Sequence, residues 1–285
     1  FASIFITVGL AGHTNFNNSL ILIRNDPYDG QLARRLVPEE NQFYKVEGNN
    51  FILWGDSFAD ALSYPLNDIL LDSNIGFTSY IKHSCPSLLG VVRNENKRLG
   101  VNFAPSCIEF NENLKNELSK EDHRNKYLVI TSAYAWYSSG LNDVGESILL
   151  PKETMANHDT VGASLRNTVI WANSVGLNPI VVLAPPTFPS LKDKIRQGTE
   201  VAKGIEVELS EVVSLNARLT EILEDTNAMI IDPVPILCGA NKASCLAFNE
   251  DKEKFITWYD GSHLSEFGGR EVSRYIRDII ARDTR

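Results

Sequence analysis

The sequence predicts an α/β domain with a doubly wound parallel sheet of about five strands, and two observations point to it. Short apolar runs of strand length are unbroken rather than alternating with polar residues, which is typical of strands covered by helices on both faces. Amphipathic helical patterns lie between these runs or after them. With 285 residues, 43% of them hydrophobic, the chain can bury the core of one large domain or of a domain with an appendage.

Five apolar runs are the expected strands. They cover residues 51–54, 75–81, 127–131, 179–183 and 228–231. In a doubly wound sheet, ligands bind at the carboxyl ends of the strands. We therefore expect the chemistry to lie in the loops that directly follow these runs.

Four helical patterns accompany the strands. The first includes Leu62, Leu66 and Ile69, and it contains Pro65, which should kink or restart the helix. The second pattern ends just before Gly176, which is a suitable C-cap for a helix. The remaining patterns cover residues 161–175, 212–223 and 272–280.

The charge of the chain argues against nucleic-acid binding. The net charge is −9, the pI is about 5.1, and lysines and arginines are scattered among acidic residues rather than gathered in a basic stripe. No metal site is expected either, because the cysteines lack a C-x-x-C pair and no histidine cluster lies beside them.

The first fifty residues differ from the rest. Residues 1–12 are apolar and almost uncharged, cover about half of the roughly 20 residues that a membrane-spanning helix needs, and lack signal-peptide features. We expect them to be the end of a transmembrane helix; an ordinary buried N-terminal segment is the alternative. Residues 13–50 are polar and rich in turn signals, and are expected to be a linker or extension packed on the main domain, residues 51–285.

The four cysteines fall as two local pairs, Cys85 with Cys107 and Cys238 with Cys245, each bracketing a loop-like stretch. Among the three possible connectivities, pairing of nearest neighbours is the economical one. Two disulfides would place the domain outside the reducing cytosol. Four buried free thiols are the alternative.

Gly55-Asp56-Ser57 follows the first expected strand directly, at the edge where ligands bind. Glycine permits a tight turn, and a serine at the start of the next helix has its own N–H pointing to where an oxyanion could form. The tripeptide alone is a weak signal. Its position makes Ser57 a candidate nucleophile.

Asp260 and His263 stand just before the last helical pattern. A serine hydroxyl needs a neighbouring base to act as a nucleophile, and an imidazole needs a carboxylate to fix its tautomer and stabilise its cation. An aspartate and a histidine on one loop can supply both to a serine delivered by another loop. Alone, the pair could equally be an N-cap aspartate beside a surface histidine.

The combination of a strand followed by Gly-Asp-Ser with Asp-x-x-His-Leu-Ser before a terminal helix resembles the SGNH hydrolase superfamily. The closer likeness, from about Phe51 to the C-terminus, is to SGNH domains fused behind acyltransferase-3 membrane domains, which are similar to bacterial lipopolysaccharide O-antigen O-acetyltransferases. It includes Cys85-Pro86 and the Cys238/Cys245 pair. The resemblance implies a flavodoxin-like sheet. It also implies that residues 1–12 are the end of the last membrane helix and that residues 13–50 link this helix to the SGNH domain.

The same resemblance implies roles for three residues. Ser57 would be the nucleophile, His263 the general base and Asp260 its partner. The sequence departs from the superfamily at the other oxyanion donors, because the usual Gly-x-Asn-Asp and a second-block glycine have no clear counterparts. We expect the N–H groups of Ser57 and of a residue near Ser84 to form the oxyanion hole, and Trp136 to line the pocket.

Other polar residues are interpreted without a functional role. Asn142-Asp143 lies too far after its strand to supply an oxyanion donor and is interpreted as a loop pair. The remaining histidines are expected to be on the surface or locally hydrogen-bonded, with His83 the one near the site. They are His13, His83, His123 and His158.

Three functions remain open. The first is transfer of an acyl group, expected to be acetyl, to a sugar hydroxyl of a bacterial surface glycan such as lipopolysaccharide O-antigen. The enzyme would then be the periplasmic domain of an inner-membrane protein. The second is a carbohydrate O-acetyl esterase with the same triad, and the third a non-catalytic glycan-binding module. No cofactor is expected in this domain, which lacks a Gly-rich phosphate cradle or basic pocket for acetyl-CoA. The preceding acyltransferase-3 membrane domain would use that donor.

Overall fold

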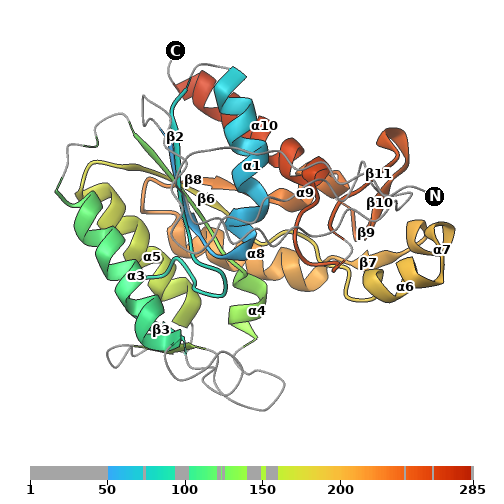
Figure 1. Cartoon of the computed structure of the whole chain (residues 1–285), viewed down its shortest axis with the longest axis horizontal. Coiled ribbons are helices and arrows are strands. Elements are labelled where there is room, and N and C mark those ends of the chain that lie inside the picture. The colour runs from blue at the N-terminus through green and yellow to red at the C-terminus, as the bar shows by residue number, and fades with distance from the viewer. Residues whose placement is uncertain are drawn as a thin grey trace, which may run out of the picture.

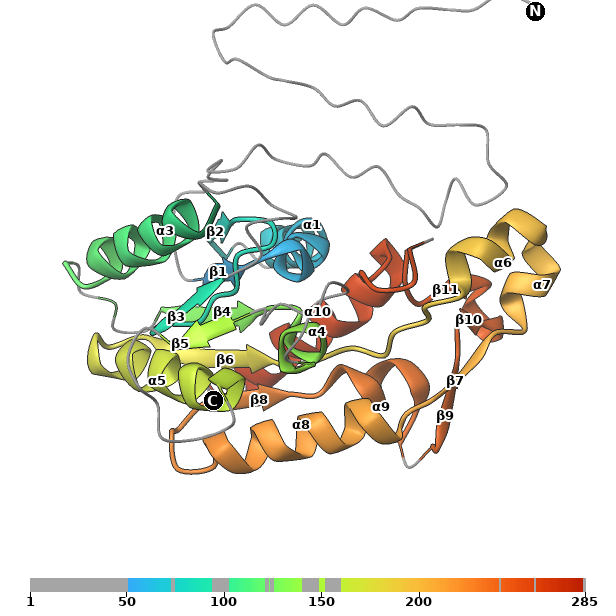
Figure 2. The ribbon, with the colours of Figure 1, turned by 90° about the horizontal axis from the view of Figure 1, so that it is seen from below.

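The computed structural model describes most of the chain from Phe51 onward (Figures 1 and 2). The described residues are 51–72, 75–93, 103–120, 123, 126–139, 149–151, 160–240, 242–258 and 260–283. The predictions for residues 1–12 and 13–50 lie outside them, as do those for His13, His158 and Asn142-Asp143.

The central sheet has five parallel strands in the order β2-β1-β4-β6-β8. They are β1 (Phe51–Gly55), β2 (Phe77–Ile81), β4 (Tyr127–Thr131), β6 (Asn178–Val182) and β8 (Met229–Ile231). The predicted fold class and the predicted number of strands are confirmed. The second strand begins later than residue 75, because the Ile75 N–H still bonds to the Leu70 carbonyl at the end of the preceding helix.

Both faces of the sheet are buried, as the unbroken apolar runs predict. Along β1, Phe51 and Leu53 pack into one core layer, whereas Ile52 and Trp54 pack into the opposite layer. The first layer includes α1 (Ser57–Asp72), α9 (Pro233–Cys238) and α10 (Glu266–Asp283); the second includes α3 (Phe103–Leu118), α5 (Thr160–Ser174) and the end of α8 (Ser210–Leu223). Figure 1 shows α1 and α10 on one side of the strands and α3 and α5 on the other.

Helix α1 passes through Pro65 without restarting, contrary to one of the two outcomes expected. Pro65 has no N–H to offer the Ala61 carbonyl. Gly269 of α10 packs at this place, and a Cβ there would lie 2.8 Å from Pro65 Cγ and 3.1 Å from the Ala61 oxygen. The absence of a side chain at Gly269 therefore lets α10 pack closely against α1 at Pro65. At the end of α5, Gly176 has a φ of 83° and follows the last helical residues, as its predicted C-cap role requires.

The structure also has short elements outside the central sheet, which the apolar pattern did not predict. They are β3 (Val91–Arg93), α4 (Tyr134–Ser138), β5 (Leu149–Pro151), α6 (Leu191–Gln197), α7 (Thr199–Lys203), β7 (Glu206–Glu208), β9 (Ser244–Leu246), β10 (Phe248–Asn249), η1 (Glu250–Lys252) and β11 (Lys254–Phe255). The pairs β7–β9 and β10–β11, with α6 and α7, form an appendage beside α9 and α10 (Figure 2).

The structure contains the two disulfides expected from the sequence. Cys85–Cys107 joins the loop after β2 to α3, with 5.5 Å between the Cα atoms, and Cys238–Cys245 joins the end of α9 to β9, with 5.2 Å. The first does not merely bracket a loop, since Cys107 lies within a helix. Within the described part of the chain, no helix is long and apolar enough to cross a membrane, and no group of three or more His, Cys, Asp or Glu side chains is arranged to hold a metal ion.

Candidate active site

The turn after β1 places Ser57 at the first position of α1. Gly55 lies against the next strand, where a Cβ would approach the Thr131 carbonyl oxygen to 2.0 Å and Ala59 Cβ to 2.5 Å. No other residue fits there without moving backbone. β1 also has β2 on one side and β4 on the other, so this turn is at the point where the order of the sheet reverses, the usual ligand site of such folds.

Asp56, between that glycine and Ser57, is buried and holds the turn together. Its Oδ1 accepts the Phe58 N–H at 2.9 Å, and its Oδ2 accepts the Ala133 N–H at 3.1 Å and the Tyr137 hydroxyl at 2.8 Å. Burial raises the pKa of Asp56, against the opposing effect of these three donors. The motif singled out this residue only as a neighbour of Ser57, because its partners Ala133, the N-cap of α4, and Tyr137, within α4, are far away in the sequence.

His263 lies between Ser57 and Asp260. Its Nε2 is 2.7 Å from Ser57 Oγ, and its Nδ1 is 2.7 Å from Asp260 Oδ2. The second oxygen of Asp260 accepts the N–H groups of Ser262 and His263 at 2.9 and 3.1 Å. The three candidate triad residues are therefore brought together in the order that a hydroxyl, a base and an orienting carboxylate require.

The ionised form of Asp260 is favoured. Its partial burial acts to raise the pKa, but the hydrogen bond and charge of His263, with the two backbone N–H groups, hold the pKa below its usual value. The Phe58 ring lies 4.9 Å from the imidazole, centroid to centroid, and limits how the ring can turn. A carboxylate that stays ionised beside Nδ1 keeps the Nε2 lone pair directed at Ser57.

The loop that carries Asp260 and His263 is fixed by its own turn and by the loop after β6. The Trp258 N–H bonds to the His263 carbonyl at 2.7 Å, and the Phe188 N–H bonds to the Gly261 carbonyl at 2.6 Å. Gly261 has a φ of 77°, and a Cβ there would lie 2.0 Å from the Phe188 oxygen. The glycine thus lets the loops approach closely enough to aim His263 at the sheet edge.

The two further residues expected near the site lie in the loops that flank it. Ser84 follows β2 and has a φ of 63°, unusual for a residue other than glycine, and Trp136 lies on α4 directly after β4. Ala133, at the place of the usual superfamily donor block, gives its N–H to Asp56. The β4 loop therefore supports the nucleophile turn through Ala133 and Tyr137.

A pocket of about 550 Å³ opens at the same edge of the sheet, between α4, the loop after β6 and the start of α8. Its walls include Ser138, Thr187, Glu211 and Arg218. Trp136 lies on the same short helix but is not among the lining residues, and its ring packs on Tyr137 with 5.2 Å between centroids. The lining also includes apolar side chains such as Pro185 and Leu215, and none of the three triad residues is part of it.

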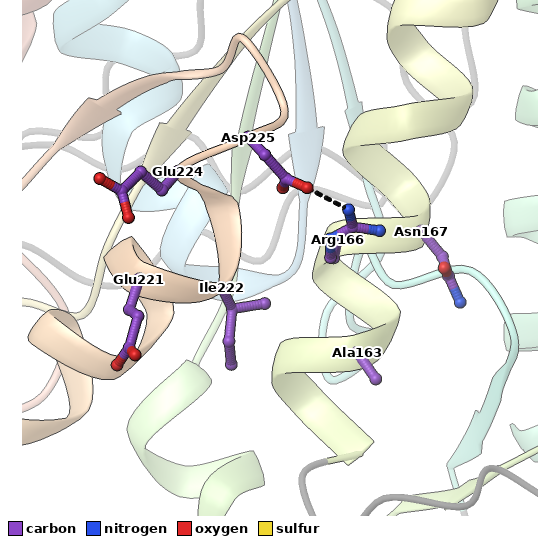
Figure 3. Close-up of a pocket in the computed structure, with 7 residues that line it drawn as sticks. All are labelled: Ala163, Arg166, Asn167, Glu221, Ile222, Glu224 and Asp225. Atoms are coloured by element: carbon purple, nitrogen blue, oxygen red, sulfur yellow. Dashed lines mark hydrogen bonds and ion pairs between the residues drawn. The ribbon is translucent and has the colours of Figure 1, made fainter.

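Another pocket, of about 690 Å³, lies between α5 and the end of α8 (Figure 3). Arg166 and Asp225 form an ion pair of 2.7 Å across it. Because Asp225 leads into β8, this pocket lies toward the amino ends of the strands, away from the triad. It is not a candidate for the acyl chemistry.

Comparison with known proteins gives one family and several structural neighbours. A family model described as "SGNH domain (fused to AT3 domains)" matches residues 28–278. The periplasmic domain of a lipopolysaccharide acetyltransferase from Salmonella ser. Paratyphi A is similar with a TM-score of 0.59 and 18% identity, covering 83% of this chain and 85% of that one. No curated protein matches the chain significantly.

Two more distant structures have TM-scores below 0.5. A putative acylhydrolase from Bacteroides fragilis has a TM-score of 0.46 and 16% identity, covering 91% of this chain and 96% of that one. A catalytic mutant of an acetylxylan esterase from Geobacillus stearothermophilus has 0.43 and 16%, covering 82% and 96%. At 18% identity, the likeness to the Salmonella structure shows the fold alone.

Proposed function

This chain belongs to the family of SGNH domains that are fused to AT3 domains, and from that premise we propose that it transfers an acetyl group to a sugar hydroxyl of a bacterial surface glycan. Ser57 is the nucleophile in this proposal, His263 the general base and Asp260 its orienting partner. The observation that carries the proposal is the pair of 2.7 Å contacts through which His263 joins Ser57 Oγ to Asp260.

The first half-reaction acylates the serine. Ser57 Oγ bonds to the carbonyl carbon of the acyl donor while its proton passes to His263 Nε2. Collapse of the tetrahedral intermediate breaks the bond to the donor's leaving atom, which takes the proton back from Nε2. The Ser57 N–H, at the first turn of α1, is directed at the developing oxyanion.

The second half-reaction moves the acetyl group to the glycan. A sugar hydroxyl gives its proton to His263 Nε2 and bonds to the carbonyl carbon of acetyl-Ser57. Ser57 Oγ then leaves and recovers that proton, so the base returns to its starting state. The pocket beside α4, which opens at the same edge of the sheet, is where we place the acceptor saccharide.

The donor side is assigned to the AT3 membrane domain. That domain would use acetyl-CoA and pass the acyl group across the bilayer to Ser57, which places this domain in the periplasm. The oxidised cysteine pairs support an oxidising compartment. The similar Salmonella structure, a periplasmic domain of a lipopolysaccharide acetyltransferase, supports lipopolysaccharide O-antigen as the kind of acceptor.

A carbohydrate O-acetyl esterase is the second candidate, because water can replace the sugar hydroxyl in the second half-reaction without any change in the triad. A binding module without catalysis is disfavoured, since the triad is aligned for proton transfer.

The test compares this domain alone with the full-length protein in membranes. We expect the domain to hydrolyse 4-nitrophenyl acetate slowly and not to acetylate glycan from acetyl-CoA, whereas the membranes acetylate O-antigen. Ser57→Ala should abolish both activities, and Ser190→Ala, at an exposed serine with no capping hydrogen bond, should leave both unchanged. Rapid removal of acetyl groups from glycan by the domain would favour the esterase, and ester hydrolysis undiminished in Ser57→Ala would exclude both.

A further inference from the structure

A second aspartate–histidine pair lies on the other side of the nucleophile turn. His83 Nε2, in the loop after β2, is 2.9 Å from Asp60 Oδ2. Asp60 is on α1, one turn after Ser57, and its side chain is 1% exposed, whereas that of His83 is 36% exposed. The pair therefore ties the loop after β2 to the first turn of the helix that begins with the nucleophile.

The next residue, Ser84, has the strained backbone described above, with a φ of 63°. Glycine adopts this conformation freely, but a residue with a Cβ keeps it only where the surroundings hold it there. Conformations of this kind gather at functional sites. Ser84 thus needs restraint from its neighbours.

The restraints lie on both sides of Ser84. On one side is His83 with its bond to Asp60. On the other is Cys85, whose N–H bonds to the Lys82 carbonyl at 3.0 Å and whose sulfur is joined to Cys107 on α3. The loop is thereby tied to α1 at His83 and to α3 at Cys85, the two residues that flank Ser84.

Strand register brings this loop to the nucleophile. Gly55 pairs with Ile81 in the parallel β1–β2 ladder, and the Lys82 N–H bonds to the Gly55 carbonyl at 3.1 Å. Ser57 lies two residues past Gly55, and Ser84 three residues past Ile81. Both leave the sheet at its carboxyl edge, on adjacent strands.

We infer that Asp60 and His83 are positioning residues that hold Ser84 in its left-handed conformation, so that the Ser84 backbone N–H acts beside the Ser57 N–H as the second donor to the oxyanion. The inference rests on the proposed acyl chemistry at Ser57. The hydrogen-bonded His83 and the Cys85–Cys107 disulfide restrain the backbone of Ser84; a glycine at this position would not need that restraint.

The test measures kcat and KM for 4-nitrophenyl acetate in this domain. We expect His83→Ala to lower kcat by about 10- to 100-fold with little change in KM, since a misplaced oxyanion donor weakens binding of the transition state alone. His83→Gln, which keeps an N–H near the position of Nε2, should stay close to wild type. Ser84→Gly should also stay active, because the N–H is needed rather than the hydroxyl.

The double variant His83→Ala/Ser84→Gly gives the sharpest readout. Glycine reaches the left-handed conformation without help, so the double variant should recover most of the kcat lost in His83→Ala. A merely structural role for His83 gives no such rescue. Arg166→Ala is the matched control, since it breaks an ion pair of similar length in the remote pocket of Figure 3 and should leave kcat unchanged.

Wild-type kcat in His83→Ala, or a double variant as slow as His83→Ala, would overturn the inference. If His83→Ala is too unstable to assay, Ser84→Val decides: its β-branched side chain disfavours a positive φ, so kcat should fall well below that of Ser84→Gly, and equal values would refute the inference. Ser57→Ala is assayed in parallel. Undiminished hydrolysis in Ser57→Ala rejects the proposed function, whereas loss in Ser57→Ala with full activity in His83→Ala rejects only the positioning role.

Discussion

His263 Nε2 lies 2.7 Å from Ser57 Oγ although the two residues are 206 positions apart in the sequence. The serine is delivered by the first strand and the histidine by the loop before the last helix. Contacts between α1 and α10, and between the loop after β6 and Gly261, hold these distant segments together. The reactivity of the serine therefore depends on packing across the whole sheet, and the predictions below probe that dependence.

Asp260→Asn should reduce ester hydrolysis by about 10⁴-fold, a loss typical when a triad carboxylate becomes an amide and the imidazole takes the wrong tautomer. The measurement is kcat/KM for 4-nitrophenyl acetate, with thermal unfolding as a check of the fold. Asp251→Asn, the same change on exposed η1 of the appendage, should leave the rate unchanged. Equal rates in the two variants would contradict the role of Asp260.

Hydrolysis should decrease on acidification along a single limb, because protonated His263 cannot accept the Ser57 proton. Asp260 should not add a second limb, since its pKa is held below the usual value and the carboxylate stays ionised. The profile of kcat/KM between about pH 5 and 8 checks this. Activity independent of pH in that range would argue against a histidine base.

The depressed pKa of Asp260 also has a consequence for stability. A carboxyl group whose pKa is lower in the folded than in the unfolded state stabilises the fold above its unfolded value, about 3.9, and loses that contribution as the pH falls through the folded pKa. The free energy of unfolding of Asp260→Asn should therefore fall less than that of the wild type between about pH 5 and pH 3. Urea titrations at both pH values measure the difference, and parallel losses would contradict it.

Gly55→Ala should destabilise the domain and inactivate it. The new Cβ would meet a backbone oxygen at 2.0 Å, and overpacking of this kind costs about 1–3 kcal/mol or more, with displacement of the nucleophile turn. Gly204→Ala is the matched control, because the nearest atom to its Cβ would be 3.9 Å away and its φ is −80°. Thermal unfolding and ester hydrolysis of both variants should separate them clearly.

The two disulfides should contribute unequally. In the chain-entropy model, the Cys85–Cys107 bond, with a sequence separation of 22, stabilises the folded domain by about 3 kcal/mol. The Cys238–Cys245 bond closes a shorter loop, with a separation of 7, and stabilises it by about 2 kcal/mol. Paired Cys→Ala variants and urea unfolding give the two values, and non-reducing peptide mapping checks the pairing. Four alkylatable thiols in native protein would contradict both bonds.

The Asp60–His83 pair shows where prediction from the sequence stopped. The sequence predicts that His83 is on the surface or locally hydrogen-bonded; its side chain is partly exposed, but its hydrogen bond is to Asp60, 23 positions away. Its partner, Asp60, lies in α1, the helix that starts at Ser57 and follows the neighbouring strand β1. Neither the contact between the two side chains nor the unusual φ of Ser84 is visible in the sequence, because both follow from how β2 pairs with β1.

The sequence by itself determined the class of fold, because unbroken apolar runs of strand length, with amphipathic helical patterns between them, are typical of a sheet covered on both faces. It also indicated Ser57, Asp260 and His263 through their places beside strand and helix ends. Tertiary structure decided the support of that site. Asp56 gains Ala133 and Tyr137 as partners, and Gly261 gains contact with Phe188, only when segments distant in the chain pack together. Local patterns indicate which residues prefer a strand, a helix or a turn. Hydrogen bonds between separate loops depend instead on strand register and on how closely the segments pack, and no local pattern predicts these.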